Sequence, residues 1–426
     1  MLDMKWIRQN HEQVQTVARQ KGIKISIAEL LAWDEKKRLL LQETESLRET
    51  RNKLSQQIGA FVHRGALEEA NQIKQRVKES NERLAALEAE LAGAERECDA
   101  RMALVPNVVS PDTPYGRSDA DNVEVKRVGT AQNFAFEPKD HIALGELHQL
   151  VDIPRGVKAA GTRSYFLKGA GVLLHRAVQQ LAVDLLLRKG FTLLEVPLMV
   201  RTETMNHTGF FPLGEDQTYR VAREDKWLAG TSEVPMVAYY ANEIVDAEQP
   251  IKLAAASVCF RSEVGSAGRD VHGLYRVHQF AKVEQVILCK ADPELSEALL
   301  QEITANAEEL LKCLELPYRV MAVCTGDMSQ KTYKQYDIET WMPSRGAYGE
   351  THSSSNLHDF QARRSNIRYR DEDGELKYCH TLNNTAVASP RILIPLLENH
   401  QEEDGSIRIP AALQPYMNGL ERLIMK

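Results

Sequence analysis

Apolar residues recur every seven positions across residues 28 to about 104, in a stretch where glycine is sparse and proline is absent. Such a heptad pattern predicts two helices that pack along a shared apolar seam. A short break bounded by Gly59 and Gly65 separates the two runs, so we expect antiparallel neighbours. The recurring positions are Leu40, Leu47 and Leu54 in the first helix and Ala70, Val77, Leu84, Leu91 and Cys98 in the second, with Ile73, Leu87 and Ala94 along a second seam.

The predicted pair of helices forms a long arm. At 1.5 Å per residue it extends on the order of 50 Å. Between Asp34 and Arg101 the chain carries 13 Lys and Arg against 14 Asp and Glu. This near balance is typical of a solvated coiled coil laced by salt bridges, which serves dimerisation or acts as a spacer. Taken alone, the arm favours that structural role over nucleic-acid binding.

Two strand-like runs within residues 260–284 are joined by a loop rich in glycine and charge. Successive side chains on a strand point to opposite faces, so Arg261 and Glu263 should share one face of the first strand. The pattern predicts an antiparallel hairpin with one packed face and one exposed, functional face. On the second strand, the functional face would present Arg276, His278, Phe280, Lys282 and Glu284, and the packed face Val277, Ala281, Val283 and Ile287.

The predicted functional face combines three kinds of chemistry. An arginine suits a phosphate, carboxylates suit an ammonium group, and Phe280 offers a surface for a flat ring. The alternative is an ordinary surface hairpin with solvated charges. A phenylalanine among charges and three glycines in the loop favour a binding site over that alternative.

Polar side chains two residues apart also occur in two later segments. Thr231 and Glu233 would share a face if extended, as would Asn383 and Thr385. A carboxylate accepts and a threonine hydroxyl can donate, so Glu284 with Thr385 suits a substrate hydroxyl, while Glu233 with Thr231 suits an ammonium group. Each pair is a weak signal alone, and their value lies in their combination.

The segments around these pairs have simpler interpretations. Residues 105–125 contain three prolines and several turn formers, which predicts a linker. Residues 171–189 place apolar side chains at helical spacing and are followed by Gly190, so we predict a helix there. A strand leading to Pro197 should follow.

Composition restricts the class of protein. The chain has 426 residues, enough for two or three domains, with 43% hydrophobic and 27% charged content typical of globular proteins. No apolar run approaches the roughly 20 residues that cross a bilayer, and the N-terminus lacks an apolar signal core, so a cytoplasmic protein without membrane contact is expected. Six scattered cysteines argue against a disulfide framework or a zinc site. The net charge of −7 does not indicate a nucleic-acid binder, although a local basic stripe would suffice for one.

The wording of the hairpin segment resembles a known family. Phe-Arg-Ser-Glu, Gly-Ser, Gly-Arg-Asp and Val-His-Gln-Phe follow in order within residues 260–280, as in motif 2 of the class II aminoacyl-tRNA synthetases, in the form found in seryl-tRNA synthetases. The opening MLDMKWIRQN and the segment RNKLSQQIG are also similar to that family, and the resemblance covers nearly the whole chain. It implies an α+β fold, with an antiparallel sheet flanked by helices, preceded by an all-α long antiparallel coiled coil. The implied domains are an arm at residues 1–104 (coiled coil about 28–104), a linker at 105–125 and a catalytic domain at 126–426.

The resemblance also implies a reaction and a site. Serine would be activated with ATP and Mg²⁺ to seryl-adenylate and transferred to tRNA(Ser), and also to tRNA(Sec). Arg261, Glu284 and Arg391 would be catalytic. Serine would be bound by Thr231, Ser232, Glu233, Arg261, Glu284, Asn383 and Thr385. ATP would be bound by Arg261, Ser262, Glu263, Val277, His278, Gln279, Phe280, Glu350, Thr351, His352, Ser353 and Arg391, with Mg²⁺ held by Glu350 and Ser353.

In the family, the arm grips the long variable arm of the tRNA, and motif 1, matched by the helix at 171–189 and its following strand, builds a homodimer. An ordinary core helix and strand would fit that last pattern equally well. The implied tRNA-binding residues are Arg48, Arg51, Lys53, Arg64, Lys74, Arg76 and Lys78 on the arm, and Arg269 in the hairpin loop, which would guide the acceptor end.

Motif 3 departs from the bacterial pattern Asn-Gly-Ser-Gly-Leu-Ala-Val-Gly-Arg, because residues 383–391 read Asn-Asn-Thr-Ala-Val-Ala-Ser-Pro-Arg. Three glycines are lost, and methyl groups stand where backbone might approach the nucleotide. His352 also replaces a usual small residue, and we expect it to be a polar neighbour of the nucleotide rather than a base. These departures leave open a duplicate synthetase that gives resistance to a serine-mimicking antibiotic. A ligase that loads a carrier protein is disfavoured by the arm, and a non-catalytic RNA-binding paralogue by the retained site residues.

Overall fold

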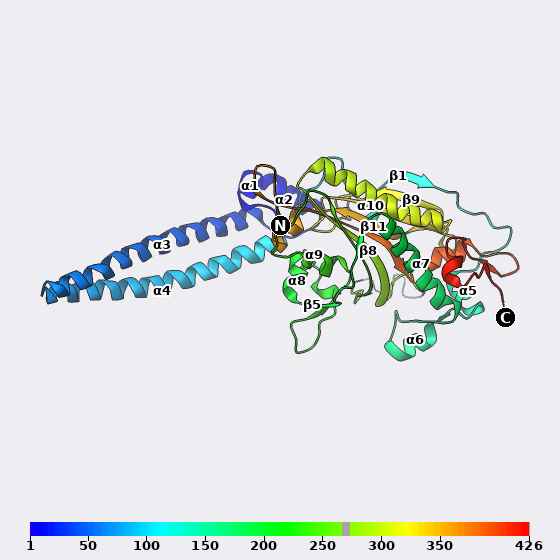
Figure 1. Ribbon diagram of the computed structural model, residues 1–426, viewed down its shortest axis with the longest axis horizontal. Coiled ribbons are helices and arrows are strands. Elements are labelled where there is room, and N and C mark those ends of the chain that lie inside the picture. The colour runs from blue at the N-terminus through cyan, green and yellow to red at the C-terminus, as the bar shows by residue number, and fades with distance from the viewer. Residues whose placement is uncertain (266–272, 426) are drawn as a thin grey trace. The chain divides into compact units, whose positions relative to one another are not determined.

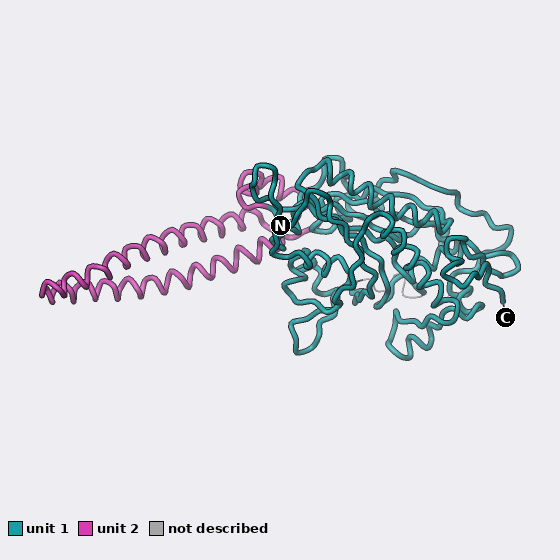
Figure 2. The backbone as a smooth tube through the Cα atoms, in the orientation of Figure 1, with its two compact units in different colours: residues 1–2, 20–22, 106–426 teal, residues 3–19, 23–105 magenta. Residues whose placement is uncertain are grey.

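The structure is a computed structural model that describes residues 1–265 and 273–425. The chain forms two compact units (Figure 2). The smaller unit contains residues 3–19 and 23–105, and the larger contains residues 1–2, 20–22 and 106–426.

The smaller unit is helical, as the heptads predict. Its two long helices, α3 (Ile27–His63) and α4 (Leu67–Leu104), lie antiparallel (Figure 1) and follow two short ones, α1 (Met4–Gln9) and α2 (His11–Gln20). The turn comes later than the predicted break: Gly59 is helical, and Gly65 makes the turn with a positive φ of 74°. Most of the predicted seam positions are buried: Leu40, Leu54, Ala70, Ile73, Leu84, Leu87, Ala94 and Cys98.

Ion pairs join the two long helices outside this seam. Arg48 lies 2.7 Å from Glu88, and Arg83 lies 3.0 Å from Glu43. All four side chains are about half exposed, and pairs of that kind contribute roughly 1 kcal/mol or less. The apolar seam therefore supplies most of the stabilisation of the arm.

The larger unit is built on an eight-stranded sheet with the order β1-β9-β10-β11-β14-β8-β7-β4, in which, among the described residues, only β4 and β7 pair in parallel. An antiparallel-dominant sheet confirms the expected class of fold. Its strands are β1 (Val123–Val128), β4 (Thr192–Leu193), β7 (Ile251–Phe260), β8 (Gln279–Cys289), β9 (Tyr318–Ala322), β10 (Lys334–Met342), β11 (Ala347–Asn356) and β14 (His380–Ser389).

Two long helices, α7 (Ala170–Arg188) and α10 (Pro293–Cys313), pack against one face of the sheet (Figure 1). The main core lies between them, with Val283 and Ile287 of β8 facing the helices. On the other face, α9 (Glu233–Ala238) packs against β8 and α11 (Phe360–Ser365) against β14. The remaining elements are α5 (His141–Leu147), α6 (Ile153–Ala160), α8 (Thr202–His207), α12 (Leu393–Asn399), β2 (Val151–Asp152), β3 (Phe166–Leu167), β5 (Met199–Val200), β6 (Trp227–Leu228), β12 (Arg368–Arg370), β13 (Leu376–Tyr378), β15 (Ile407–Arg408), β16 (Arg422–Leu423) and the 3₁₀ turns η1 (Asp119–Asp121), η2 (Glu215–Gln217), η3 (Pro343–Arg345) and η4 (Gln414–Met417).

Helix α7 agrees with the predicted helix at residues 171–189. Among the described residues, α7 is also the one helix long and apolar enough to cross a membrane, judged by length and composition alone. Half of that stretch is buried, and its apolar side chains join the core on the sheet. This is the pattern of a core helix. The strand expected after it is replaced by the two-residue strands β4 and β5.

Segment 105–125, predicted as a linker, is tied to the larger unit. Asn107 N donates to Gln330 O and Ser110 N to Tyr333 O, both at 2.9 Å. Strand β1 begins at Val123, inside the predicted linker. Prolines and turn formers therefore mark an irregular but packed segment here.

The predicted hairpin is present but shorter than its pattern indicates. Strand β7 ends at Phe260, and β8 begins only at Gln279, so Arg261 and Glu263 lie in the loop rather than on a strand. Glu263 has a positive φ of 52°, which no extended strand allows. The alternation holds along β8, but Val277 precedes the strand and does not face the packed side as predicted.

Two β-bulges change the phase of the central strands. The pairing of β10 with β11 passes from Ile338–His352 to Glu339–Glu350, which leaves Thr351 as the extra residue. The pairing of β14 with β8 passes from Thr385–Glu284 to Val387–Val283, which leaves Ala386 as the extra residue. A bulge reverses the face to which the following side chains point.

Candidate active site

A cleft of about 1050 Å³, including space open to solvent, lies on the sheet face opposite α7 and α10. It gathers residues from β8, β11 and β14, from the start of α9, and from the loops after β7 and β9. The lining residues are Phe210, Thr231, Glu233, Arg261, Glu263, Leu274, Tyr275, Val277, Phe280, Lys282, Glu284, Ser329, Lys331, Gln335, Glu350, Thr351, His352, Ser353, Ser355, Asn383, Thr385, Ala388, Pro390 and Arg391.

The two bulges explain how single strands line this cleft along their whole length. On β14, Thr385 and Ala388 both face the cleft although they are three positions apart, an odd spacing that would place them on opposite faces of a regular strand. On β11, Ser353 and Glu350 do the same across the bulge at Thr351. Without the extra residue, one of each pair would face the helices instead.

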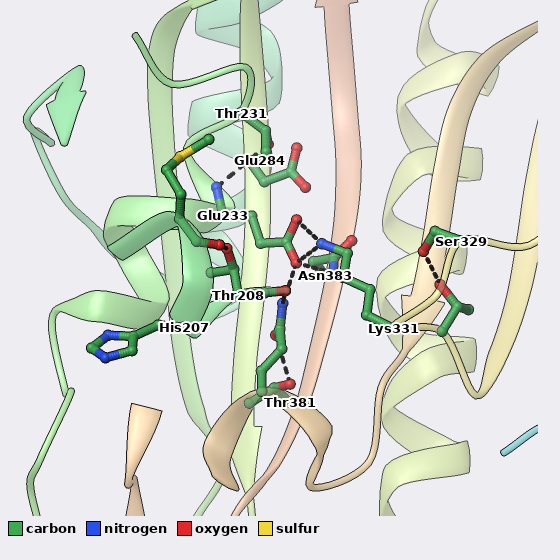
Figure 3. Close-up of polar contacts among 12 residues, drawn as sticks. His207, Thr208, Thr231, Glu233, Glu284, Ser329, Lys331, Thr381 and Asn383 are labelled. Atoms are coloured by element: carbon green, nitrogen blue, oxygen red, sulfur yellow. Dashed lines mark hydrogen bonds and ion pairs between the residues drawn. The ribbon is translucent and has the colours of Figure 1, made fainter. Parts of the chain in front are cut away.

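Glu233 lies at one end of the cleft, in the first turn of α9 and not on an extended strand as predicted. Its Oε1 accepts from Lys331 Nζ at 2.6 Å, Gln361 Nε2 at 2.7 Å and Asn383 Nδ2 at 2.9 Å (Figure 3). Its Oε2 accepts from Lys331 at 2.7 Å. Thr231 lies beside it, with Oγ1 accepting from Glu233 N at 3.4 Å. This carboxylate is held rigidly and retains acceptor capacity for an ammonium group.

Glu284 lies on β8, next to Glu233 in the cleft (Figure 3). The hydroxyl of Thr385 lies 3.5 Å from Glu284 Oε2, and Lys282 Nζ lies 2.5 Å from the same oxygen. Burial raises the pKa of Glu284, and the neighbouring ammonium of Lys282 offsets part of that rise. The predicted functional face of β8 is thus buried rather than exposed at Lys282 and Glu284. An enclosed acceptor beside a threonine hydroxyl suits a small substrate hydroxyl.

At the other end of the cleft lie side chains suited to a nucleotide. The Arg261 guanidinium lies 5.2 Å from the centre of the Phe280 ring, and its Nε donates to Gly230 O at 3.4 Å. The Glu263 carboxylate, 3.5 Å from Arg276, is held near the same ring by the loop. The Phe280 ring suits stacking on a purine, and the N–H donors of the adjacent Arg261 guanidinium suit a phosphate.

Arg391 follows β14 and crosses over the ring of Tyr275, with 4.5 Å between the guanidinium carbon and the ring centre. It donates to Tyr275 O at 3.1 Å and to Glu350 O at 3.2 Å, and lies 3.7 Å from the Glu350 carboxylate. These contacts fix the guanidinium at the cleft wall. Arg391 and Arg261 thus both line the cleft.

His352 lies in the cleft wall on β11 and is almost wholly buried. Burial lowers its pKa to about 3, so the imidazole is neutral at physiological pH. Its Nδ1 lies 2.8 Å from the hydroxyl of the bulge residue Thr351. An imidazole with so low a pKa is a poor proton acceptor, and its expected place beside a nucleotide stays a prediction.

The residues predicted to hold Mg²⁺ fit a divalent cation. Glu350 and Ser353 both line the cleft, and the buried Asp337 pairs with Ser353 across β10 and β11. Burial and the Glu350 carboxylate together raise the pKa of Asp337 well above its usual value. Carboxylate and hydroxyl oxygens are the donors that Mg²⁺ prefers, and a cation would relieve the repulsion between the two acids. Within the described residues no cluster of three or more His, Cys, Asp or Glu forms a complete protein cage, which is usual where phosphates supply the other ligands.

Four predicted residues do not line the cleft. Ser232 is buried at the N-cap of α9, and Ser262 Oγ donates to Asp216 O at 2.8 Å. His278 Nδ1 faces Arg261 O at 3.0 Å, and Gln279 is an exposed first residue of β8. All four flank lining residues, within the segments in which the resemblance implied a site. Arg269 lies outside the described residues.

Ten of the lining residues were not assigned by sequence, and three of them carry charge or an aromatic ring that shapes the site: Lys331, Lys282 and Tyr275. Lys331 comes from the loop between β9 and β10, whose sequence shows no periodic pattern of apolar and polar residues. Lys282 was placed on the correct face, but nothing in the alternation gave it a partner. Tyr275 could have been suspected as an aromatic before Arg276, yet its place under Arg391 depends on the fold.

Basic residues predicted to bind tRNA are distributed along the outer part of the arm. Arg48 and Lys53 are each paired with a glutamate, and Arg51 donates to Asn52. Among the residues that the structure describes, ion pairs are absent from four exposed cations at the tip and along α4: Arg64, Lys74, Arg76 and Lys78.

Comparison with known proteins identifies the class first. The model of the tRNA synthetase class II core domain (G, H, P, S and T) matches residues 219–400, which contain most of the cleft. The model of the seryl-tRNA synthetase N-terminal domain matches residues 1–109.

Whole-chain relatives narrow the class to one family. The chain is 45% identical over 424 residues to the serine–tRNA ligase of Deinococcus radiodurans, covering 99% of both chains, and 41% identical to that of Rubrobacter xylanophilus, covering 98% of both. The solved seryl-tRNA synthetase of Pyrococcus horikoshii, in complex with ATP, superposes with a TM-score of 0.91 at 37% identity over the whole of both chains. The cytoplasmic serine–tRNA ligase of Naegleria fowleri, in complex with AMP, gives 0.87 at 28%, covering 100% of this chain and 99% of that one. The chain belongs to the seryl-tRNA synthetase family, which confirms the resemblance.

Proposed function

We propose that the chain is a serine–tRNA ligase that forms seryl-adenylate from serine and ATP and then acylates tRNA(Ser). One observation carries this: a single cleft holds two carboxylates suited to an ammonium group and a hydroxyl, beside an arginine and a phenylalanine suited to a nucleotide. A small amino acid with one hydroxyl matches the first pair, and ATP matches the second.

The reaction needs positioning more than covalent catalysis. Glu233 receives the serine ammonium, and Glu284 with Thr385 receives the hydroxyl. The carboxylate of serine then attacks the α-phosphate of ATP, and pyrophosphate leaves. Arg261 neutralises charge that develops on the α-phosphate, Arg391 meets the γ-phosphate, and Phe280 stacks on the adenine, whose amino group faces Glu263.

Glu350 and Ser353 are the residues that would hold Mg²⁺. When bound, the ion neutralises phosphate charge and orients the triphosphate. The raised pKa of Asp337 beside Glu350 supports this assignment.

The arm at residues 1–104 is proposed to bind the long variable arm of tRNA(Ser), and of tRNA(Sec). Support comes from the match to the N-terminal domain of the family and from the cations near its tip. Binding to phosphates needs a local cluster of positive charge and does not need a positive net charge on the whole chain. We also propose a cytoplasmic homodimer, with residues 105–125 connecting the arm to the catalytic domain at 126–426.

Pyrophosphate exchange measured with each of the twenty amino acids tests the proposal. Serine alone should support ATP–pyrophosphate exchange, without tRNA, and addition of tRNA(Ser) should yield seryl-tRNA. Exchange with no amino acid, or a preference for another one, would overturn it. A preference for another amino acid would indicate a ligase of different specificity. Exchange with no amino acid would indicate a paralogue that only binds RNA.

A further inference from the structure

Four successive backbone carbonyls in the loop between β9 and β10, residues 329–332, are bonded by two side chains from earlier in the sequence. Asn107 Nδ2 donates to Lys331 O at 3.0 Å. Lys21 Nζ lies 3.2, 3.3 and 2.5 Å from the carbonyl oxygens of Ser329, Gln330 and Thr332. The loop is thus wrapped around one ammonium group, and both Lys21 and the loop belong to the larger unit.

Because Lys21 is buried, its ammonium group needs hydrogen-bond partners from the protein. The side chain is only 7% exposed, and burial lowers its pKa to about 7. An ammonium group has three donors and no acceptor, and three carbonyls satisfy all of them. A buried lysine left without such partners would be costly, and so would the three carbonyls without it.

The loop that Lys21 holds carries Lys331 into the cleft. Lys331 Nζ contacts both oxygens of Glu233, at 2.6 and 2.7 Å (Figure 3). It also lies 5.2 Å from the centre of the Phe210 ring. Three donors converge on Glu233 Oε1, whereas Lys331 is the donor on Oε2. Lys331 therefore bridges both oxygens and holds the plane of the carboxylate, while Gln361 and Asn383 saturate Oε1 and leave more acceptor capacity on Oε2.

We propose that Lys21 is a positioning residue for amino-acid activation, which acts through Lys331 to fix the carboxylate of Glu233 toward the substrate ammonium group. This inference rests on the proposed function, in which Glu233 receives that ammonium. Lys21 itself does not line the cleft. Its effect passes through the carbonyls of the loop, because a loop with free carbonyls would turn toward water and carry Lys331 with it.

The experiment is steady-state pyrophosphate exchange on the full-length chain, with serine and ATP varied separately. Lys21→Met removes the donors and keeps the chain length, and Lys24→Met, an exposed lysine three residues on, is the matched control. We expect Lys21→Met to raise the KM for serine at least tenfold, with the KM for ATP within twofold of the parent. Lys21→Arg, which restores donors, should recover part of the loss.

A double variant tests the route. If Lys21 acts through Lys331, then Lys21→Met combined with Lys331→Met should be no worse for serine than Lys331→Met alone. An unchanged KM for serine in Lys21→Met overturns the proposal, and so do additive losses. A lowered Tm with equal rises in both KM values would instead assign Lys21 a purely structural role.

A replacement variant and a parallel assay of the parent protein make the experiment conclusive. If Lys21→Met does not fold, Lys21→Gln, which keeps an amide donor, takes its place with the same criteria. The parent protein assayed alongside separates the two levels of inference. A parent without serine-dependent exchange refutes the proposed function, whereas an active parent with an indifferent Lys21 variant refutes only the positioning role.

Discussion

The ammonium group of Lys282 lies 2.5 Å from Oε2 of Glu284, two residues further along β8, and both side chains are almost wholly buried. Residues two positions apart on a strand share a face of the sheet, so the regular geometry of β8 places both side chains in the cleft. Burial raises the pKa of Glu284, and the Lys282 ammonium favours the ionised carboxylate and offsets part of that rise.

The first prediction concerns this carboxylate. Glu284→Gln keeps the side-chain volume but removes the charge that accepts from a substrate hydroxyl and from Lys282. We expect kcat/KM for serine in pyrophosphate exchange to fall about 100-fold or more, because buried polar groups would be mispaired with the substrate. The KM for ATP should change little, and the exposed Glu372→Gln serves as control. Unaltered exchange would remove the assignment of Glu284.

The second prediction separates the arm from the chemistry. Replacing residues 51–80 by a short glycine-rich turn removes the tip and keeps the cluster of Leu40, Leu87 and Ala94. Adenylate formation should stay within about twofold, since the cleft lies in the other unit, whereas charging of tRNA(Ser) should fall about 100-fold or more because phosphate contacts are lost. Parallel exchange and charging assays measure both. An equal loss of the two activities would make the arm structural.

The third prediction concerns the metal. Glu350→Gln removes one of the oxygens that suit Mg²⁺, and also the charge that, together with the larger effect of burial, raises the pKa of Asp337. The Mg²⁺ concentration for half-maximal exchange should rise about tenfold, because a carboxylate is a much better ligand than an amide. A magnesium titration at saturating serine and ATP measures this shift. A curve that coincides with that of the parent would show that Glu350 does not hold the ion.

The fourth prediction concerns acid stability. His358 and His380 stack with ring centres 4.3 Å apart, and burial lowers the pKa of each to about 4. Between pH 6.5 and 4 the unfolded chain binds more protons at these sites than the folded one, so stability falls as pH falls, by up to about 1.4 kcal/mol per pH unit for each histidine.

Urea denaturation at several pH values between 4.5 and 7.5 measures that slope. His380→Phe keeps an aromatic ring in the stack and removes one titrating group, so its stability should depend less steeply on pH than that of the parent. An identical slope in the two proteins would mean that His380 does not contribute to acid denaturation.

The parts of this molecule that sequence could predict are those in which a period repeats. Heptads placed the seam of the arm, and alternation placed Lys282 and Glu284 on one face of β8. Thr231 and Glu233 show the limit, since a spacing of two fits a strand, yet Glu233 begins α9. Lys331 was not predictable, because a long-range loop contact leaves no periodic trace.

Motif 3 shows another limit. Asn384 stands where bacterial relatives usually have glycine, which suggested only a loss of space near the nucleotide. In the structure its side chain faces away from the cleft and donates to Ser354 Oγ at 2.7 Å and to Ser353 O at 3.2 Å. Gln285 links it to Asn306 of α10. The replacement therefore supports the strand that carries Ser353, which no single-sequence pattern could indicate.

The extra residues Thr351 and Ala386 make the cleft more sensitive to chain length than to residue identity. Deleting Ala386 would leave Thr385 in place and turn Ala388 and Pro390 toward the helices, so the amino-acid half and the nucleotide half would no longer share one wall. Each half can accept substitutions independently of the other. A one-residue deletion in either strand would therefore separate the two halves and stop the reaction between their substrates, however well the remaining side chains were preserved.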